Sequence, residues 1–484
     1  MIPVRRTTIA LRPDQSRVLI RPFTPGDEER TRGILTRILS FPEAEAALLM
    51  EEVLAAFGTR HPGISAVFGE RFAQLRYLLP PGANLSAARK LLIGSYFVCE
   101  YSLESAALFN PSIVPHPDQT GLPPGVLRFI LSLRATGEGH LSSITFRTGT
   151  IDAGGHVEVD EAKGNLSEPR QTPTSAYEKA LFARKLQELG LTCDFTRGVL
   201  DRLGEVFGMA DLRREVDSGL ERPASAEAAL AMGHAADGIL RLGYSNYEVQ
   251  FRENQDLSER IIFPASPSQR NGIEDARFVR FQNDDGTREY YATFTAYDGR
   301  TVMPELMETS DFLRFRFITL NGPAAQNKGM ALFPRKVNGL YAMLSRMDNE
   351  NLYLVQSDNV HFWFEAKPVL KPEFPWETVQ LGNCGSPIET DAGWLVLSHG
   401  VGPMRQYAIG AFLLDKDDPS RVIGRLREPL LRPTESERRG YVPNVVYTCG
   451  ALLHGGQLIL PYAYADHATS FASITLADVL AAME

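Results

Sequence analysis

The densest group of side chains that could carry chemistry is Arg270-Asn271-Gly272-Ile273-Glu274-Asp275-Ala276-Arg277-Phe278. Adjacent carboxylates beside an arginine can have their pKa values pushed apart, which leaves one of them able to donate a proton. A surface turn with an ion pair would contain the same residue types. The segment alone therefore indicates an acid–base site without excluding a structural role.

Basic residues follow in the next part of the chain. They occur in Asn327-Lys328, in Phe333-Pro334-Arg335-Lys336 and in Ser345-Arg346-Met347-Asp348-Asn349. Lysine and the arginine fork suit a phosphate or a carboxylate. A solvated basic edge would look the same, and so would a structural histidine in Ser398-His399-Gly400 or a strand end at Tyr462-Ala463-Tyr464-Ala465-Asp466.

The elements that must position these residues differ along the chain. Residues 1–95 are predicted to be mostly helical, and Thr24 and Pro25 are typical of an N-cap and a first helical residue. Strand-like runs begin near residue 105 and resume after Gly243, whereas residues 160–240 have a helical pattern. A long meander must close on itself or hide its edges, as a sandwich, a barrel or a propeller does. Periodicity does not choose among these, although the short, regularly spaced strands favour a propeller.

Composition excludes several classes of protein. The 484 residues predict two to three domains, and the net charge of −9 argues against a general nucleic-acid surface. No apolar run approaches the ~20 residues that span a bilayer, and the N-terminus lacks a signal core, so we expect a cytoplasmic protein. The four cysteines are scattered without a CxxC pair, and no ligand-like cluster predicts a metal.

The order of the polar segments is more specific than any one of them. Together they resemble glycoside hydrolase family 130, the β-mannoside phosphorylases and related mannosidases. The matching blocks run through most of residues 105–480 in the family's order. They are Phe109-Asn110-Pro111-Ser112, Leu133-Arg134-Ala135, Gly272-Ile273-Glu274-Asp275-Ala276-Arg277, Asn327-Lys328, Leu332-Phe333-Pro334-Arg335-Lys336, Ser345-Arg346, Gly385-Ser386-Pro387-Ile388, Ser398-His399-Gly400-Val401, Val442-Pro443-Asn444-Val445-Val446 and Tyr464-Ala465-Asp466.

The resemblance implies a mainly β fold, a five-bladed β-propeller with an N-terminal helical region and a helical insertion. Residues 1–95 would be the helical extension, and residues 96–484 the catalytic propeller with its insertion at about 160–240. The extension would either cap the acceptor side of the pocket or form a subunit interface in a homo-oligomer.

The resemblance also assigns roles to single residues. Asp275 matches the family's proton donor, which is thought to pass its proton through the mannose 3-hydroxyl. Lys328, Arg346 and His399 match phosphate-binding positions. Sugar-binding positions fall on Asn110, Arg134, Arg277 and Asp466. The chain departs from the family pattern at Ala276, where proline is common, and at Lys328, where some members have arginine and its bidentate geometry.

These roles predict phosphorolysis of a β-mannooligosaccharide, with inorganic phosphate as co-substrate and no other cofactor. An inverting hydrolase needs a second carboxylate ~6.5–9.5 Å from the acid, whereas a phosphorylase needs positive charge to hold its anionic nucleophile. The product would be α-mannose 1-phosphate. The long chain and the segment 345–351 favour a β-1,2 over a β-1,4 linkage. A β-mannoside hydrolase and a non-catalytic glycan-binding propeller are the alternatives.

Overall fold

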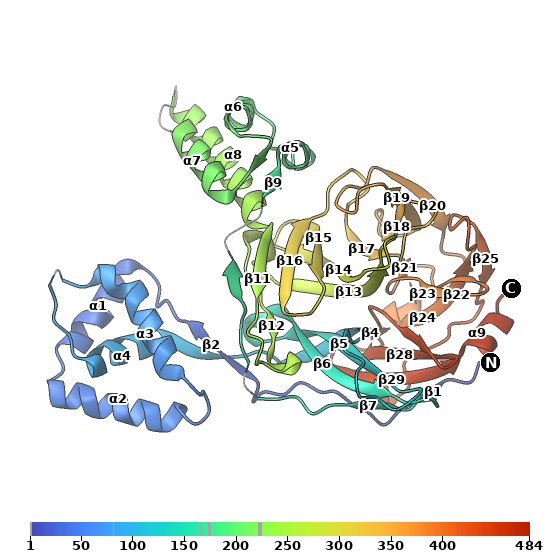
Figure 1. Cartoon of the computed structure of the whole chain (residues 1–484), viewed down its shortest axis with the longest axis horizontal. Coiled ribbons are helices and arrows are strands. Elements are labelled where there is room, and N and C mark those ends of the chain that lie inside the picture. The colour runs from blue at the N-terminus through green and yellow to red at the C-terminus, as the bar shows by residue number, and fades with distance from the viewer. Residues whose placement is uncertain (1, 81, 165, 173–175, 221–224) are drawn as a thin grey trace. The chain divides into compact units, whose positions relative to one another are not determined.

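A computed structural model describes residues 2–80, 82–164, 166–172, 176–220 and 225–484 (Figure 1). The chain divides into two compact units. The smaller unit comprises Gln15–Leu103 and Gly164–Leu166, and the larger comprises Met1–Asp14, Glu104–Lys163 and Ser167–Glu484.

The smaller unit consists mainly of helices. Helix α1 (Glu28–Leu39) begins after Asp27, whose side chain accepts a hydrogen bond from Arg30 N at 2.8 Å. The predicted start at Thr24 and Pro25 is wrong, because Gly26 has a φ of +110°, outside the helical region. A pair of antiparallel strands extends this unit to Leu103, beyond its expected end at residue 95. The other elements are α2 (Glu43–Phe57), α3 (Ile64–Leu75), α4 (Ala87–Ser95) and the antiparallel strands β2 (Val18–Pro22) and β3 (Val98–Ser102).

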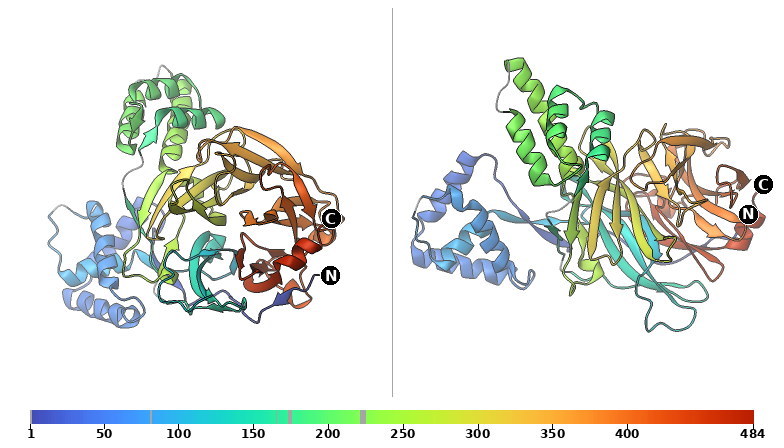
Figure 2. Two further views of the ribbon diagram at one scale, coloured as in Figure 1. Left: turned by 45° about the vertical axis from the view of Figure 1, so that its right-hand side comes forward. Right: turned by 45° about the horizontal axis from the view of Figure 1, so that its top comes forward.

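Five sheets, each with at least four strands, make up most of the larger unit, and all their strand pairs are antiparallel (Figure 2). The prediction of a mainly β chain is confirmed. The first sheet contains β4 (Ala107–Pro115), β5 (Leu127–Thr136), β6 (Ser142–Ile151), β7 (Val157–Val159) and β12 (Ile261–Ile262). The second contains β8 (Arg170–Thr172), β11 (Tyr247–Gln250), β13 (Ile273–Gln282), β14 (Arg288–Tyr297), β15 (Val302–Thr309) and β16 (Arg314–Thr319).

The remaining three sheets follow in chain order. The third contains β17 (Lys328–Leu332), β18 (Tyr341–Arg346), β19 (Leu352–Ser357) and β20 (Glu365–Leu370). The fourth contains β21 (Gln380–Asn383), β22 (Ile388–Thr390), β23 (Gly393–Val401), β24 (Tyr407–Leu414) and β25 (Val422–Arg425). The fifth contains β26 (Val446–Tyr447), β27 (Leu452–His454), β28 (Gln457–Tyr464), β29 (Ala468–Thr475) and β1 (Arg5–Arg6), and α9 (Leu476–Ala481) follows it.

Each sheet contacts the next, and the last contacts the first. Strand β4 contacts β13, β14 contacts β17, β18 contacts β21, β24 contacts β26, and β28 contacts β4. In the fifth sheet Arg5 lies opposite Ser473 and Arg6 opposite Ala472, so the strand nearest the N-terminus pairs with the last strand of the chain. Apolar side chains fill the spaces between sheets, with Phe146, Phe278 and Phe315 in one cluster between the first two.

Four helices interrupt the second sheet in sequence. They are α5 (Lys179–Glu188), α6 (Asp194–Arg202), α7 (Met209–Leu220) and α8 (Ala226–Tyr244). The helices therefore begin about 20 residues after the predicted start of the insertion at residue 160 and end four residues after its predicted end at residue 240. Phe182, Leu186 and Leu212 belong to their own apolar core. In the described part of the chain, no helix has both the length and the apolar character needed to cross a bilayer.

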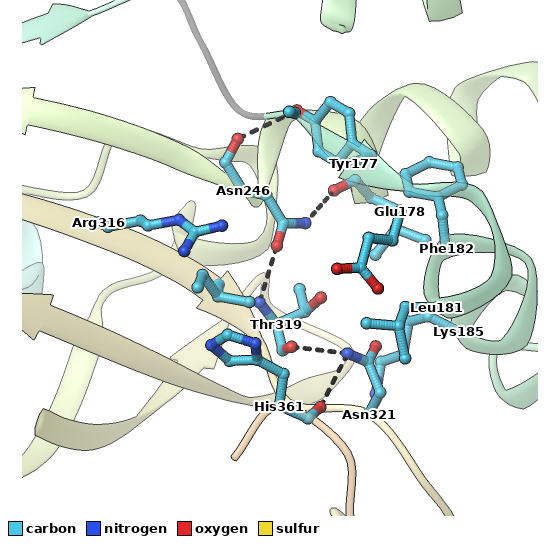
Figure 3. A pocket seen from close by; sticks show the side chains of 13 residues that line it. Tyr177, Glu178, Leu181, Phe182, Lys185, Asn246, Arg316, Thr319, Asn321 and His361 are labelled. Atoms are coloured by element: carbon cyan, nitrogen blue, oxygen red, sulfur yellow. Dashed lines mark hydrogen bonds between the residues drawn. The ribbon is translucent and has the colours of Figure 1, made fainter. Parts of the chain in front are cut away.

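A pocket lies where this insertion meets β16 (Figure 3). Asn246 accepts a hydrogen bond from Thr319 N at 3.0 Å, and Asn321 donates to the carbonyls of Thr319 and His361. Close by, the Lys185 ammonium donates to the Leu320 carbonyl at 2.7 Å. The bonds of Asn246 and Lys185 join the insertion to the sheet, and those of Asn321 join the end of β16 to the segment before β20. The residues that line the pocket include none of the predicted catalytic or binding residues.

Candidate active site

The edge strands β4, β13 and β17 of the first three sheets share one irregularity that determines where their side chains point. The register shifts between Phe109 and Ser112 in β4, between Glu274 and Arg277 in β13, and between Lys328 and Ala331 in β17. Each bulge contains a residue with positive φ, namely Asn110 at 48°, Asp275 at 54° and Gly329 at 88°. Bulges re-aim side chains and are common beside active sites.

The carboxylate of Asp275 in the second sheet is held by two residues of the first sheet. Asn110 Nδ2 donates to Asp275 Oδ1, and Arg134 Nη1 lies 3.3 Å from the same oxygen. Burial alone would raise the pKa of the Asp275 carboxyl. The positive charges of Arg134, Arg277 and Lys328 outweigh burial, so this pKa lies below its ordinary value and the group is ionised at neutral pH.

Glu274 belongs to the same charge cluster. Arg134 Nη2 lies 2.9 Å from Glu274 Oε1, and Lys328 Nζ lies 2.6 Å from Glu274 Oε2. In a regular strand two successive side chains would point to opposite faces. The bulge after Glu274 lets both Glu274 and Asp275 reach Arg134. The paired carboxylates are visible in the sequence, but the role of Glu274 is not, because a bulge cannot be read from residue types.

Arg277 supports the site from below the surface. Its side chain is 2% exposed, and Nη1 donates to the Asp275 carbonyl at 3.2 Å. Nε donates to the Cys384 carbonyl at 2.8 Å, and Nη2 donates to Tyr447 Oη at 2.9 Å. The guanidinium therefore ties the backbone of Asp275 to two other sheets. This burial favours a positioning role over the predicted contact with sugar.

The structure brings the three predicted phosphate-binding residues together. Lys328 lies opposite Arg346 across β17 and β18, and Arg346 Nη1 lies 2.9 Å from His399 Nε2. Gly382 lies opposite His399 across β21 and β23. A Cβ on Gly382 would lie only 2.4 Å from His399 Cε1 and 3.1 Å from Arg346 Cδ. The close approach of these side chains therefore requires glycine at position 382.

His399 is a neutral hydrogen-bond acceptor in this arrangement. Burial, followed by the charges of Arg346 and Arg277, lowers the pKa of the His399 imidazole well below its ordinary value. Arginine has no acceptor, so Arg346 must donate to Nε2 and the imidazole proton is on Nδ1. The ring packs against Tyr407 and Tyr447 at centroid distances of 5.9 and 4.9 Å. His399 thus orients Arg346 and adds no positive charge.

Several buried polar atoms near Arg346 have no hydrogen-bond partner within the described residue ranges. They are Arg346 Nε, Ser345 Oγ, Ser386 Oγ, His399 Nδ1 and both amide atoms of Asn383. A Cβ on Gly329 would lie 3.7 Å from Asn383 Oδ1 and 3.8 Å from Arg346 Nε, so one space adjoins both atoms. Buried polar atoms in folded proteins are normally paired, so a group of unpaired ones marks a place where water, an ion or another ligand can bind. Asn383 and Ser386 were not predicted, although they adjoin or belong to a matching block.

Asp466 lies near the acid cluster from the fifth sheet. It follows β28 with a φ of 46°. Burial raises the pKa of the Asp466 carboxyl and the charge of Asp275 adds to this effect, whereas Arg134 and Arg405 oppose it, and the resulting pKa is about 6. Arg134, Asp275 and Asp466 are therefore near enough to interact electrostatically, as their predicted shared site requires.

The described residues contain no group of three or more His, Cys, Asp or Glu side chains that could hold a metal ion. The site offers instead a carboxylate held by cations and, beside it, an arginine with free donors. Such an arrangement can hold an anion, and its carboxylate can pass a proton to a leaving group once it has gained one.

The sequence matches a known family and several characterised enzymes. The pattern of glycoside hydrolase family 130, described as beta-1,4-mannooligosaccharide phosphorylase, matches residues 234–484. A 1,2-beta-oligomannan phosphorylase from Thermoanaerobacter sp. (strain X514) is 34% identical over 258 residues, which cover 51% of this chain and 83% of that protein. A beta-1,4-mannooligosaccharide phosphorylase from Ruminococcus albus is 36% identical over 166 residues, covering 32% of this chain and 50% of that protein.

Two further similarities involve beta-1,2-mannobiose phosphorylases. The enzyme from Thermoanaerobacter sp. (strain X514) is 35% identical over 213 residues, which cover 43% of this chain and 68% of that protein. A solved structure of the Listeria innocua enzyme with beta-1,2-mannobiose aligns with a TM-score of 0.47 and 20% identity, covering 79% of this chain and 92% of that chain.

Proposed function

The chain belongs to glycoside hydrolase family 130, and from this premise we propose that it cleaves β-mannosides with inorganic phosphate, releasing α-D-mannose 1-phosphate. The preferred substrates are β-1,2-mannooligosaccharides, in line with the names of two of the relatives above. A β-1,4 preference is the alternative within the same chemistry. The enzyme works in the cytoplasm and needs no metal, so activity persists in EDTA.

The five sheets are the blades of a propeller in this proposal. Successive contacts lead from the first sheet to the fifth and back to β4, as the closed ring of a propeller requires. The bulged strands β4, β13 and β17 are then the innermost strands. Their altered residues face the central depression, where one substrate can contact side chains from several blades.

The observation that favours phosphorolysis over hydrolysis is that Arg346 has no carboxylate partner among the described residues. Arg134, Arg277 and Lys328 each lie within 4 Å of a carboxylate oxygen. Arg346 forms no such ion pair with the described residues, although it is only 8% exposed. A buried cation without a partner is costly. Phosphate would supply the absent negative charge and would accept hydrogen bonds from Arg346 Nε and Asn383 Nδ2.

The reaction proceeds by a single displacement. A phosphate oxygen attacks the anomeric carbon of the terminal mannose and forms the new C–O bond as the glycosidic C–O bond breaks. The electron pair of that bond goes to the leaving oxygen, which receives a proton originating from Asp275. The family resemblance implies that the mannose 3-hydroxyl relays this proton. Two negative charges on bound phosphate would raise the lowered pKa of Asp275, so co-substrate binding favours the protonated donor.

A β-mannoside hydrolase is the second candidate. Asp466 lies near Asp275 and forms no ion pair with the described residues, and its pKa of about 6 leaves it ionised at neutral pH. It is therefore the carboxylate that an inverting hydrolase would use to activate water. The fully occupied oxygens of Glu274 make that residue a poorer base.

Incubation with β-1,2-mannotriose, with and without phosphate, separates the candidates. Phosphorolysis predicts no reaction without phosphate, and mannose 1-phosphate of α configuration with it, observed by phosphorus and proton NMR. Asp466→Asn should then keep the phosphate requirement while weakening sugar binding. Free mannose released equally in both incubations, and abolished by Asp466→Asn, would establish the hydrolase instead.

A further inference from the structure

An exposed aromatic pair lies at the edge of the active site. The rings of His140 and Tyr441 stack with centroids 5.7 Å apart and planes inclined by 29°. Tyr441 is 56% exposed, and its hydroxyl lies 3.4 Å from His140 Nδ1. Two rings from distant parts of the chain are thus held side by side while one remains largely open to solvent.

Backbone contacts connect this pair to the residues of the site. Val442 N donates to the Ala465 carbonyl at 2.8 Å, and a Cβ on Gly440 would lie 2.7 Å from Ala465 Cβ. Tyr441 therefore lies between two residues that contact the neighbour of Asp466. His140 lies in the turn between β5 and β6, which begins just beyond Arg134.

A second turn adds donors beside the same carboxylate. The turn between β23 and β24 includes Met404 and Arg405, which have φ values of 56° and 55°. Left-handed backbone is unfavourable for such side chains and is concentrated at functional sites. Met404 is 89% exposed, and the charge of Arg405 acts on Asp466. The edge thus combines aromatic faces with a guanidinium group.

We infer that His140 and Tyr441 form a platform for a mannosyl unit of the acceptor part of the oligosaccharide, with Arg405 donating to its hydroxyls. The inference rests on the proposed function. The acid cluster is only partly exposed, so the sugars that follow the cleaved mannose must leave towards exposed loops. Pyranose C–H groups pack on aromatic faces, and the hydroxyls at the sugar edge accept hydrogen bonds from arginine. This mixture of apolar and polar groups fits an oligosaccharide.

Equilibrium titration with β-1,2-mannotriose in the absence of phosphate tests the platform without requiring any chemistry. We expect Tyr441→Ala to weaken binding roughly 3- to 10-fold, as the loss of an aromatic contact would. Tyr441→Phe keeps the ring and should bind within about 2-fold of wild type. Phe364→Ala is the matched control, because Phe364 is 58% exposed and stacks on Phe362 in another part of the larger unit.

Kinetics then distinguish a platform from a structural pair. Tyr441→Ala should raise KM for the trisaccharide and leave KM for phosphate unchanged. His140→Ala provides a second variant if Tyr441→Ala unfolds, which circular dichroism would reveal. Unchanged trisaccharide binding in both folded variants, or a lower kcat with unchanged KM values, would overturn the inference. If wild-type enzyme binds the trisaccharide without phosphate-dependent cleavage, the proposed function fails while the platform stands.

Discussion

The two halves of the site differ in how their charges are balanced. Around Asp275, Arg134 and Lys328 share Glu274, and Asn110 and Arg277 complete the cage. Around Arg346, the side-chain partner among the described residues is neutral His399, and the neighbouring polar atoms of Ser345, Asn383 and Ser386 are unpaired in the same part of the chain. Charges are balanced within the first half, whereas the second half contains several unpaired polar atoms and a cation without a counter-ion among the described residues.

This contrast separates preorganisation from binding. A carboxylate fixed by several donors needs no rearrangement when the reaction starts. Burying an arginine without a counter-ion costs desolvation free energy, because some of its N–H donors have no partner. An anion that binds there accepts those hydrogen bonds and offsets this cost. Substitutions in the first half should therefore lower turnover, and substitutions in the second should weaken the use of phosphate.

The largest effect is expected from Asp275→Asn. Removing a general acid costs typically 10²- to 10⁴-fold in rate. We expect kcat with β-1,2-mannotriose to fall by roughly that factor, while KM for phosphate changes little. Asp285→Asn, in an exposed turn where Asp285 bonds Thr287, is the control and should retain full activity. A variant as active as wild type would show that another group supplies the proton.

Arg346→Ala should act on the other half. A hydrogen bond to a charged group contributes about 1.5–3 kcal/mol, so KM for phosphate should rise about 10- to 150-fold. Initial rates over a range of phosphate concentrations measure this change. The control is Arg335→Ala, because Arg335 pairs with Glu389 and packs on Trp394. Equal phosphate KM values in the two variants would remove the distinction between the halves.

The carboxyl of Asp466 predicts a pH dependence of stability. Its folded-state pKa of about 6 exceeds the ordinary value of 3.8, so the folded protein binds this proton more tightly than the unfolded chain. Stability from this group is present at low pH and declines as pH rises from about 4 to 6. Asp466→Asn should remove that decline, worth up to about 2 kcal/mol for a partly exposed group. Urea unfolding of both proteins at about pH 4.5 and at about pH 7 measures the free energy of unfolding. An equal decline between these pH values in wild type and Asp466→Asn would contradict the assignment.

Gly382→Ala should disturb the second half without removing a functional group. Its methyl would contact His399 Cε1 at 2.4 Å, so the imidazole and Arg346 must move. We expect overpacking to cost about 1–2 kcal/mol of stability and KM for phosphate to rise several-fold. Gly339→Ala, in the turn between β17 and β18, is a control for the substitution itself, since nothing lies within 4 Å of the added Cβ. The positive φ of Gly339 adds backbone strain to this control. Unaltered phosphate KM in Gly382→Ala would show that the pair tolerates displacement.

The smallest effect is the response of wild-type protein to phosphate alone. Binding to the folded state at ten times Kd stabilises by about 1.4 kcal/mol and should raise Tm by about 1–2 °C in a chain of this length. Differential scanning fluorimetry in phosphate, with chloride at equal ionic strength as control, measures the shift. Arg346→Ala should lose most of it, and a shift of the same size in that variant would place the anion elsewhere.

Residue types and their order indicated which side chains come together, but they did not indicate the backbone geometry or the protonation states through which those side chains interact. Asn110, Arg134 and Asp275 belong to matching blocks, and the structure brings them into contact. The bulge that turns Glu274 and Asp275 towards Arg134 depends on strand register, which no residue type determines. The neutral state of His399 depends on burial between Arg346 and Tyr447, and that burial arises only from the assembled sheets.

The helices and strands were predicted where local sequence signals determine them, but some of their boundaries were not. Strand-like runs and turn dipeptides indicated a mainly β chain, because alternation and turn residues are local signals. The start of α1 was missed since Asp27, Thr24 and Pro25 are all plausible first-turn residues, and only the backbone of Gly26 decides among them.

The ladder between Arg5–Arg6 and Ala472–Ser473 affects how the protein is made. It joins residues separated by nearly the whole sequence, and such distant pairings form slowly. During synthesis the fifth sheet waits with an open edge until β29 has emerged from the ribosome. Asp466, just before β29, is therefore among the last site residues to reach its place, and a nascent chain remains without a complete site until then.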